Sequence, residues 1–419
     1  MSVNFTPFSA GAFDCAVVGA GHAGVEAALA CARTGVRTAL FTLSLDAIAN
    51  MPCNPSIGGT GKGHLVYEID AMGGEMGYAA DRVTMQSRTL NSSKGAAVRS
   101  KRIQADRRKY SELMKQTIEA TPNLTVVQAE VTEVVCEPDE RGVMRVIGVR
   151  TEPCGDFACH AAILCTGTYL GGVTHVGDVH RASGPDNSLP ATGLTGHLQA
   201  LGVEMLRFKT GTPQRIHKRS IDFDALEVQP GDDWIEPFSV RTDAEKLNQI
   251  RQIPCHVVYT NEKTHEIIRA NIHRSPLYSG LIHGVGPRYC PSIEDKVVRF
   301  ADKERHQLFV EPMGESTDEM YLQGFSSSLP ADVQVEMLHS LRGFEHAEIM
   351  RYAYAIEYDC VNPLELAGTL EFKKIRGLFG AGQIKKRIGS GYAYPVTGHL
   401  MGLDTATSRS GLKRNMASM

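Results

Sequence analysis

Three spaced glycines after a short apolar run constrain the fold of this chain more than any other feature. The apolar run ends at Val18, and Gly19, Gly21 and Gly24 follow in the spacing Gly-x-Gly-x-x-Gly before an alanine-rich stretch that continues to Thr34. This order predicts a strand, a tight turn and a helix that stops at Gly35, and residues 37–42 predict the next strand. Glycines in this context let a pyrophosphate approach the backbone at a helix N-terminus. The pattern therefore predicts a βαβ unit that binds a dinucleotide, and an ordinary glycine turn is the alternative.

Two later segments repeat the combination of an apolar strand and a terminal glycine. They are residues 163–168 and residues 378–383, and the second resembles the segment that returns to the flavin in FAD proteins. We therefore expect one large dinucleotide-binding domain that is interrupted by an insertion. The second strand departs from the usual pattern, because it ends in Thr42 and Ser44 and the nearest acid is Asp46. A ribose-binding carboxylate is therefore not identified.

Composition limits the class of protein. The chain has 419 residues, of which 42% are hydrophobic and 22% charged, as in soluble globular proteins of two to three domains. The net charge of −3 excludes binding of nucleic acid by bulk positive charge. No apolar run approaches the ~18 residues of a membrane helix, and residues 1–12 do not resemble a targeting signal. The ten cysteines form no CxxC pair, so we expect reduced thiols, no metal site and a cytoplasmic location.

Other stretches are less regular. Residues 50–77 are rich in glycine and predict a long structured loop, residues 176–213 predict a second loop, and residues 103–120 predict a polar helix. The first of these loops contains Cys53 and Lys62. It is not a nucleoside-triphosphate phosphate loop, because Ser56 stands where that motif needs glycine and Gly63 where it needs serine or threonine.

Seven cations lie within sixteen residues that contain one acid, Asp106. This run suits contact with phosphates, and a solvated helix face is the alternative. Its cations are Lys94, Arg99, Lys101, Arg102, Arg107, Arg108 and Lys109.

Cys290 lies between Arg288 and Lys296, two cations that would lower the pKa of its thiol if they face it. A small buried hydrophobic role is the alternative for this cysteine.

Together these segments resemble the MnmG (GidA) family of flavoenzymes that modify the wobble uridine of tRNA. The resemblance extends over most of residues 13–384. It rests on residues 18–25, 53–74, 90–107, 209–216, 286–300, 321–327 and 378–383. It implies an α/β fold, with a Rossmann-like FAD-binding domain of the glutathione-reductase type and an inserted α+β segment.

The resemblance also implies an activity. Such enzymes bind FAD, take hydride from NADH and use methylenetetrahydrofolate as one-carbon donor. With the GTPase MnmE they add a carboxymethylaminomethyl or aminomethyl group to carbon 5 of the uridine. The implied partners are therefore tRNA, MnmE and a second copy of the chain in a homodimer.

Residue by residue, the resemblance assigns two kinds of site. The pyrophosphate of FAD would lie on Gly19, Ala20, Gly21, His22, Ala23 and Gly24. Val131, Ser188 and Gln383 match further flavin contacts, and residues 286–300, with Gly286 and Arg288, match the NAD segment. Cys53 and Cys290 match the two catalytic cysteines. Carbon 5 of uracil becomes nucleophilic once a thiolate adds to carbon 6, and the second cysteine would act as general acid or base; which cysteine does which stays open.

The resemblance weakens after Gln383. The family continues with a helix that closes the flavin domain and with a helical C-terminal domain, whereas residues 385–419 here contain six cations and one acid without helical periodicity. We therefore expect a truncated or frameshifted end without that helical domain. The expected organisation is a first part of the FAD domain (1–206), an inserted domain (207–340), the return to the FAD domain (341–384) and an atypical tail (385–419).

Three functions are compatible with these features. The first is the tRNA-modifying flavoenzyme, and the second is a flavin-dependent reductase or a folate-dependent tRNA methyltransferase. The third is an inactive remnant that binds flavin or RNA. Flavin content separates the enzymes from an empty scaffold, and dependence on MnmE and tRNA separates the first from the second.

Overall fold

A computed structural model describes residues 8–286 and 291–384 of the chain. Its centre is a five-stranded parallel sheet in the order β23-β11-β2-β3-β7. The strands are β2 (Cys15–Val18), β3 (Thr38–Thr42), β7 (Leu124–Gln128), β11 (Ala161–Leu164) and β23 (Leu378–Gly380). They are short and mostly fully buried, as expected when both faces of a parallel sheet are covered.

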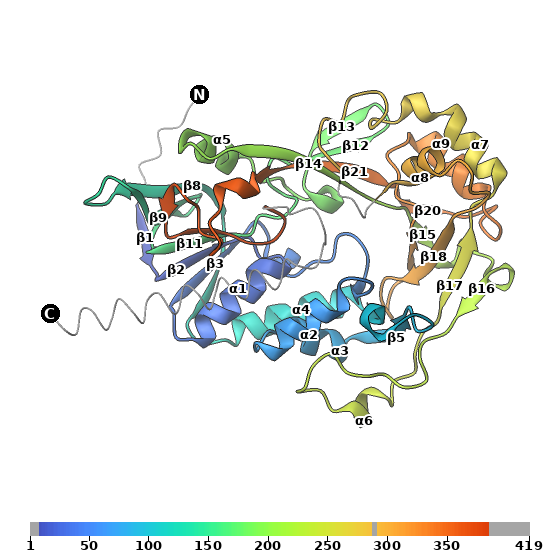
Figure 1. Ribbon diagram of the computed structural model, residues 1–419, viewed down its shortest axis with the longest axis horizontal. Helices are drawn as coiled ribbons and strands as arrows, with labels where there is room; N and C mark the ends of the chain where they lie inside the picture. Colours follow the sequence, from blue (N-terminus) through green and yellow to red (C-terminus); the bar gives the residue numbers. More distant parts are fainter. Residues whose placement is uncertain (1–7, 287–290, 385–419) are drawn as a thin grey trace.

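Helices cover one face of this sheet (Figure 1). They are α1 (His22–Arg33), α2 (Gly63–Ala71), α3 (Met76–Arg82) and α4 (Arg107–Glu119). The small side chains of α1 let it pack tightly on β2, and ten of its twelve residues are buried. This face holds one hydrophobic core, which includes Val17, Leu29, Leu40 and Tyr110.

A second sheet covers the other face and encloses a second core, with Phe41, Val131 and Leu164. Its strands are β1 (Ser9–Ala12), β8 (Glu130–Pro138), β9 (Met144–Glu152), β10 (Gly155–Ala158) and β22 (Ile375–Arg376). The expected α/β architecture, with a Rossmann-like sheet between two layers, is confirmed.

Two long strands lead out of this layered part and back into it. β14 (Met205–Thr212) and β21 (Tyr354–Val361) pair antiparallel over all eight residues and run along the top of the molecule in Figure 1. Between them lies the inserted α+β segment with its own core, which includes Ile268, Leu308, Phe325 and Leu338.

The remaining elements belong mainly to this segment and its surroundings. The strands are β4 (Ser56–Gly58), β5 (Thr84–Leu90), β6 (Ser100–Ala105), β12 (Val173–Val176), β13 (Val179–Ala182), β15 (Arg215–His217), β16 (Glu227–Gln229), β17 (Cys255–Tyr259), β18 (Gln307–Pro312), β19 (Glu319–Gln323) and β20 (Ile349–Arg351). The helices are α5 (Gly193–Ala200), α6 (Ala244–Leu247), α7 (Glu262–Ala270), α8 (Ile293–Arg299) and α9 (Ala331–His339). None of the helices in the described residues is long and apolar enough to cross a membrane.

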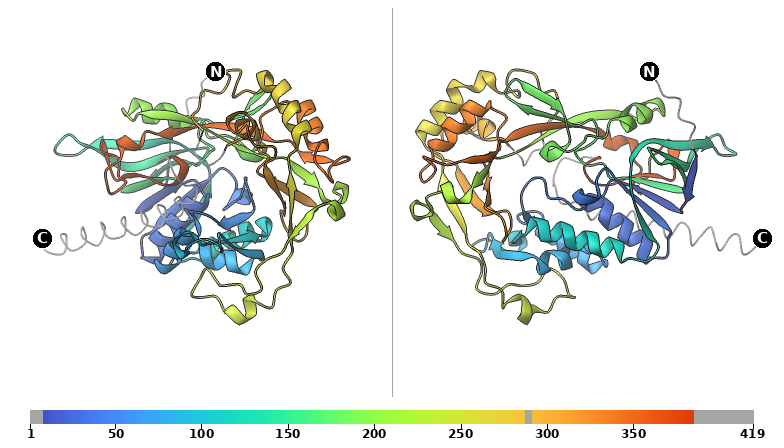
Figure 2. Two further views of the ribbon diagram at one scale, coloured as in Figure 1. Left: turned by 45° about the vertical axis from the view of Figure 1, so that its right-hand side comes forward. Right: turned by 180° about the vertical axis from the view of Figure 1, so that it is seen from behind.

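One stretch of the insertion, residues 230–253, returns to α2 and α3. The carboxylate of Asp81 accepts hydrogen bonds from the amides of Phe238 and Ser239, both at 2.9 Å, and from the Thr242 hydroxyl at 2.8 Å. Phe238 belongs to the core beside α1. Figure 2 shows this stretch, with α6, beneath the helices in both views. The insertion is therefore joined to the dinucleotide-binding part by more than its two connecting strands.

Three local expectations were wrong. Residues 100–105 form strand β6, which pairs with β4 and β5 on its two sides, and helix α4 begins only after Asp106. Asp106 caps that helix by accepting hydrogen bonds from the amides of Arg108 and Lys109. The region 50–77 contains β4, α2 and the start of α3, and the region 176–213 contains β13, α5 and β14. Glycine content concealed these short elements.

Candidate functional site

In the turn after β2, each of the three glycines has different surroundings, and these decide whether a larger residue could replace it. Gly19 has φ +104°, and a Cβ there would lie 2.5 Å from the carbonyl oxygen of Cys165. A Cβ on Gly24 would lie 1.8 Å from the Gly19 oxygen, whereas a Cβ on Gly21 would meet nothing within 4 Å. The first and third glycines are therefore required by the fold. The second leaves open space at the start of α1, where a phosphate group would approach the backbone.

Three buried polar atoms at the ends of neighbouring parallel strands have no hydrogen-bond partner in the described part of the protein. They are His22 Nδ1 after β2, Thr166 Oγ1 after β11 and Gln383 Oε1 after β23. Burial lowers the pKa of His22 to about 4, so its imidazole is neutral at pH 7. Helix α1 also has no side-chain cap and no acid in its first turn. Unsatisfied polar atoms around an open helix start fit a polar, anionic cofactor such as FAD.

The end of strand β3, where a ribose-binding acid usually follows, carries Thr42 and Ser44. Thr42, at the end of β3, donates its hydroxyl to the Ser44 carbonyl, and Asp46 is 95% exposed with Lys115 at 3.5 Å. Asp46 is therefore a surface residue, and a nearby ribose-binding carboxylate is not found here.

Hydrogen bonds join the loop of Cys53 to the glycine turn. The Ala49 amide donates to the Ala20 carbonyl at 2.8 Å. One residue further, the Asn50 side-chain oxygen accepts two hydrogen bonds from Arg107, at 3.0 and 2.7 Å. Arg107 therefore links this loop to the start of helix α4.

Asp186 continues this connection to the segment of Ser188. Its carboxylate pairs with Arg107 at 2.7 Å and with Arg351, and it accepts a hydrogen bond from the Tyr354 hydroxyl at 3.2 Å. Burial opposes ionisation, but Arg107, Arg215 and Arg351 together hold the pKa of Asp186 below its usual value. Asp186 has φ +57°, a strained conformation that these contacts maintain.

Cys53 itself is exposed and lies against a fully buried pair of side chains. Its Sγ is 3.2 Å from the Tyr321 hydroxyl. The guanidinium of Arg215 donates to the carbonyls of Pro52 at 2.8 Å and Cys53 at 3.3 Å, and it stacks 4.7 Å from the centre of the Tyr321 ring. Buried Arg215 thus holds the loop backbone and buried Tyr321 contacts the sulfur, while Cys53 as a residue is exposed.

The structure brings together some of the sequence-predicted residues. Residues 19–24, Cys53 and Ser188 are joined through the contacts above, and Gln383 follows the neighbouring strand β23. Val131 is buried in the core between the two sheets, and Gly286 is exposed next to strand β14. Arg288 and Cys290 lie outside the described residues, so the two predicted catalytic cysteines are not placed relative to each other.

Sequence reasoning missed Asp186, Arg215 and Tyr321. Residues 209–216 and 321–327 match the resembled family without an assigned role, and nothing local in the sequence shows that they meet Cys53. Their partners are far apart in the chain, since Cys53 and Tyr321 are separated by 268 positions.

The basic run of residues 94–109 does not form one helix face, and its role in contacting phosphates stays a prediction. It is divided among a loop, strand β6 and the start of α4, and acids in the described residues neutralise several of its members. Lys101 lies 3.5 Å from Asp81, Arg102 pairs with Glu311, Arg107 with Asp186 and Lys109 with Glu315.

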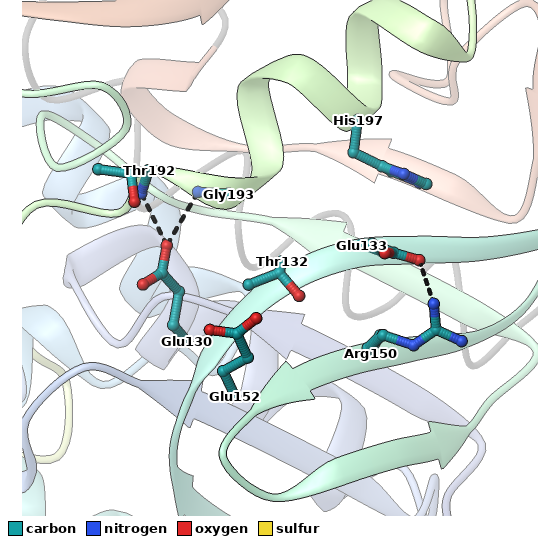
Figure 3. A pocket seen from close by; sticks show the side chains of 8 residues that line it. All are labelled: Glu130, Thr132, Glu133, Arg150, Glu152, Thr192, Gly193 and His197. Atoms are coloured by element: carbon teal, nitrogen blue, oxygen red, sulfur yellow. Dashed lines mark hydrogen bonds and ion pairs between the residues drawn. The ribbon is translucent and has the colours of Figure 1, made fainter. Parts of the chain in front are cut away.

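A separate polar pocket of about 430 Å³ lies between β8, β9 and the start of α5 (Figure 3). Glu130 accepts hydrogen bonds there from the amides of Thr192 and Gly193, and Arg150 pairs with Glu133. These groups satisfy one another, and none of the sequence-predicted site residues lines the pocket. No cluster of three or more metal-binding side chains occurs in the residues that the structure describes.

Comparisons with known proteins agree with this geometry. Residues 14–409 match the family model described as glucose inhibited division protein A. The chain is 58% identical over 377 residues to the tRNA uridine 5-carboxymethylaminomethyl modification enzyme MnmG of Caldicellulosiruptor saccharolyticus, covering 90% of this chain and 59% of that protein. It is 54% identical over 401 residues to MnmG of Lachnoclostridium phytofermentans, covering 96% and 63%.

A solved structure resembles the whole described fold. GidA of Aquifex aeolicus, in its form I crystal, superposes with a TM-score of 0.89 at 48% identity and covers 95% of this chain and 66% of that one. The chain thus spans about three fifths of the length of the curated relatives that it matches. The family match, the identities and the shared fold agree, and the chain belongs to the glucose inhibited division protein A family, which includes MnmG.

Proposed function

We propose that this chain binds FAD and acts in the modification of carbon 5 of the wobble uridine in tRNA. One observation carries the proposal: the loop of Cys53 is hydrogen-bonded to the glycine turn through Ala49 and Ala20. The loop that carries this thiol is thereby attached, four residues before Cys53, to the backbone that would receive the pyrophosphate of the cofactor. The relatives named as tRNA modification enzymes support the same activity.

The residues around the glycine turn would bind the cofactor. The open backbone at Gly21 and the start of α1 would hold the pyrophosphate, and His22, Thr166 and Gln383 supply unsatisfied polar atoms around it. When bound, FAD would supply hydride transfer, which no side chain can perform.

A cysteine thiolate, Cys53 or Cys290, would act on the uracil ring. Addition of the thiolate to carbon 6 forms a carbon–sulfur bond and moves the carbon 5–carbon 6 π electrons into an enolate. Carbon 5 would then attack the methylene carbon of the folate donor as one of that carbon's two bonds to folate nitrogen breaks. Loss of the carbon 5 proton to a base and elimination of sulfur would restore the ring and the thiolate, and a primary amine would replace the remaining folate nitrogen to give the product. The other cysteine would serve as that base.

We also propose the remaining components of the reaction. NADH would reduce the flavin at the segment 286–300, and methylenetetrahydrofolate would donate the carbon. The GTPase MnmE, tRNA and a second copy of the chain would be the partners, and the location would be cytoplasmic.

The first test is the visible spectrum of the purified chain with added FAD, before and after anaerobic NADH. A bound flavin spectrum that bleaches would support cofactor binding and hydride transfer. A protein that stays colourless after excess FAD would contradict the proposal.

The second test is Cys53→Ser. We expect loss of uridine modification in an assay with tRNA, MnmE and the substrates, with FAD still bound, because the serine hydroxyl ionises far less readily than a thiol. The Cys136→Ser variant, which changes a cysteine on strand β8, is the control and should remain active. Retained modification by Cys53→Ser would remove this cysteine from the mechanism.

A further inference from the structure

The contact between Cys53 and Tyr321 joins an accessible thiol to an inaccessible phenol. The sulfur and the phenolic oxygen are 3.2 Å apart, Cys53 is exposed, and Tyr321 is 1% exposed on strand β19. A side chain packed on a central strand has a fixed position, so the hydroxyl is held in place beneath the sulfur.

The chemistry of the pair gives the hydrogen bond a direction. Burial, with a further contribution from Cys53, raises the pKa of Tyr321 well above its ordinary value, so the phenol keeps its proton when the thiol ionises. A thiolate has no proton to give, and the O–H of Tyr321 must then be the donor. A hydrogen bond to the charged form favours that form.

Arg215 adds a positive charge beside the pair. This charge lowers the pKa of Tyr321 and so partly offsets the larger effect of burial, and it would favour a charged sulfur as well. The fully buried guanidinium of Arg215 holds the carbonyls of Pro52 and Cys53 and stacks on the Tyr321 ring, which places a positive charge behind the pair. Two acids moderate this charge. Glu319 lies 3.9 Å from Arg215, and Glu311 acts electrostatically on Tyr321.

We propose that Tyr321 is a positioning residue that donates its phenolic proton in a hydrogen bond to the sulfur of Cys53 and so maintains Cys53 as a thiolate. The inference rests on the proposed function, in which Cys53 acts as nucleophile or as general base; a thiolate serves either role.

The experiment measures alkylation of Cys53 by iodoacetamide between pH 5 and 10, without tRNA, with the Cys53 peptide followed by mass spectrometry. In Tyr321→Phe we expect the pH midpoint of alkylation to rise by about one unit, and the rate at a pH below both midpoints to fall about tenfold. Tyr358→Phe, which removes a hydroxyl from another fully buried tyrosine, should leave the profile unchanged.

The sign of the shift decides the question. An unchanged or lower midpoint in Tyr321→Phe would overturn the proposal, because the hydroxyl would then not stabilise the thiolate. Faster alkylation at every pH, with the same midpoint, would show that Tyr321 only restrains the loop and would overturn it as well. If Cys53→Ser retains tRNA modification while Tyr321→Phe shifts the midpoint, the proposed role of Cys53 fails and the hydrogen bond stands.

Discussion

Asp186 shows how single residues assemble this site from distant parts of the chain. Its carboxylate meets Arg107 from the start of α4, Arg351 from β20 and Tyr354 from β21, and its side chain is only 10% exposed. A buried carboxylate between two arginines leaves their charges unbalanced when it is removed.

We therefore expect Asp186→Asn to lower the free energy of unfolding by about 3 kcal/mol, measured by urea denaturation. Asp46→Asn is the matched control, because Asp46 is 95% exposed and its partner Lys115 lies 3.5 Å away. That change should cost less than about 1 kcal/mol. Equal effects of the two substitutions would show that the Asp186 network does not stabilise the fold.

His22 predicts a dependence of stability on pH. Because burial lowers its pKa to about 4 in the folded state, the unfolded chain binds more protons between about pH 4 and 6.5. This residue therefore makes the protein less stable as the pH falls through that window, by an amount on the order of 1–3 kcal/mol. In His22→Asn, measured without FAD, the difference in unfolding free energy between pH 7 and pH 4.5 should shrink. An unchanged difference would contradict this.

The same residues explain what the sequence could predict. The spacing of Gly19, Gly21 and Gly24 is a local pattern, since the turn and the helix start lie within six residues, although a Cβ on Gly19 would meet Cys165 from a distant part of the chain. The pattern therefore predicted the strand, the glycine turn and the helix correctly. Asp186 and Tyr321 contact partners more than 75 positions away in the sequence, and a local sequence pattern does not predict such contacts.

Among the elements, the turn between β2 and α1 contains a glycine that the fold requires, Gly24, and a glycine that cofactor binding would require, Gly21. We expect Gly24→Ala to destabilise the protein by 2 kcal/mol or more, at the order-of-magnitude level, because the new Cβ would lie 1.8 Å from the Gly19 oxygen. Gly21→Ala should leave the unfolding free energy nearly unchanged and weaken FAD binding at least about tenfold, because its Cβ would fill only open space.

Urea denaturation and quenching of flavin fluorescence measure the two effects. Gly196→Ala in helix α5 is the control, since a Cβ there meets nothing within 4 Å and no cofactor contact is expected. FAD affinity that is unchanged in Gly21→Ala would place the pyrophosphate elsewhere.

The sequence predicts an element well when the element is buried on both faces, because its residues then form an uninterrupted apolar run. Residues 161–164 are a buried parallel strand, as the apolar run indicates. The predicted helix over residues 103–120 includes the end of strand β6, because the charges of that strand belong to the same run as those of α4. The strand accommodates its charges because Lys101 lies 3.5 Å from Asp81 and donates to the backbone carbonyl of Glu236, and because Arg102 pairs with Glu311 in the insertion. Long-range pairing of charges thus overrode the local pattern.

At the scale of the whole molecule, Asp81 fastens the insertion to the helical layer. Asp81→Ala would leave the amides of Phe238 and Ser239 without their acceptor and Lys101 without an ion-pair partner. We expect a loss of about 3 kcal/mol in unfolding free energy and faster hydrogen exchange at these two amides.

The single tryptophan, Trp234, lies in the same stretch and reports its release by fluorescence. Asp243→Ala is the control, because it changes an exposed cap of helix α6 nearby and should leave exchange at Phe238 and Ser239 unchanged. Unaltered exchange at Phe238 and Ser239 in Asp81→Ala would mean that other contacts, such as the ion pair of Arg241 with Glu75, hold the stretch.

The separation of Cys53 and Tyr321 in the sequence means that the ribosome makes the two residues at different times. Tyr321 is the 268th residue added after Cys53, and its synthesis follows on the order of 10 to 50 s later at ordinary rates of translation. Throughout that interval the nascent chain carries an ordinary thiol, without the phenol beneath it. On the proposal that Tyr321 stabilises the Cys53 thiolate, this cysteine becomes reactive only after most of the insertion has been translated.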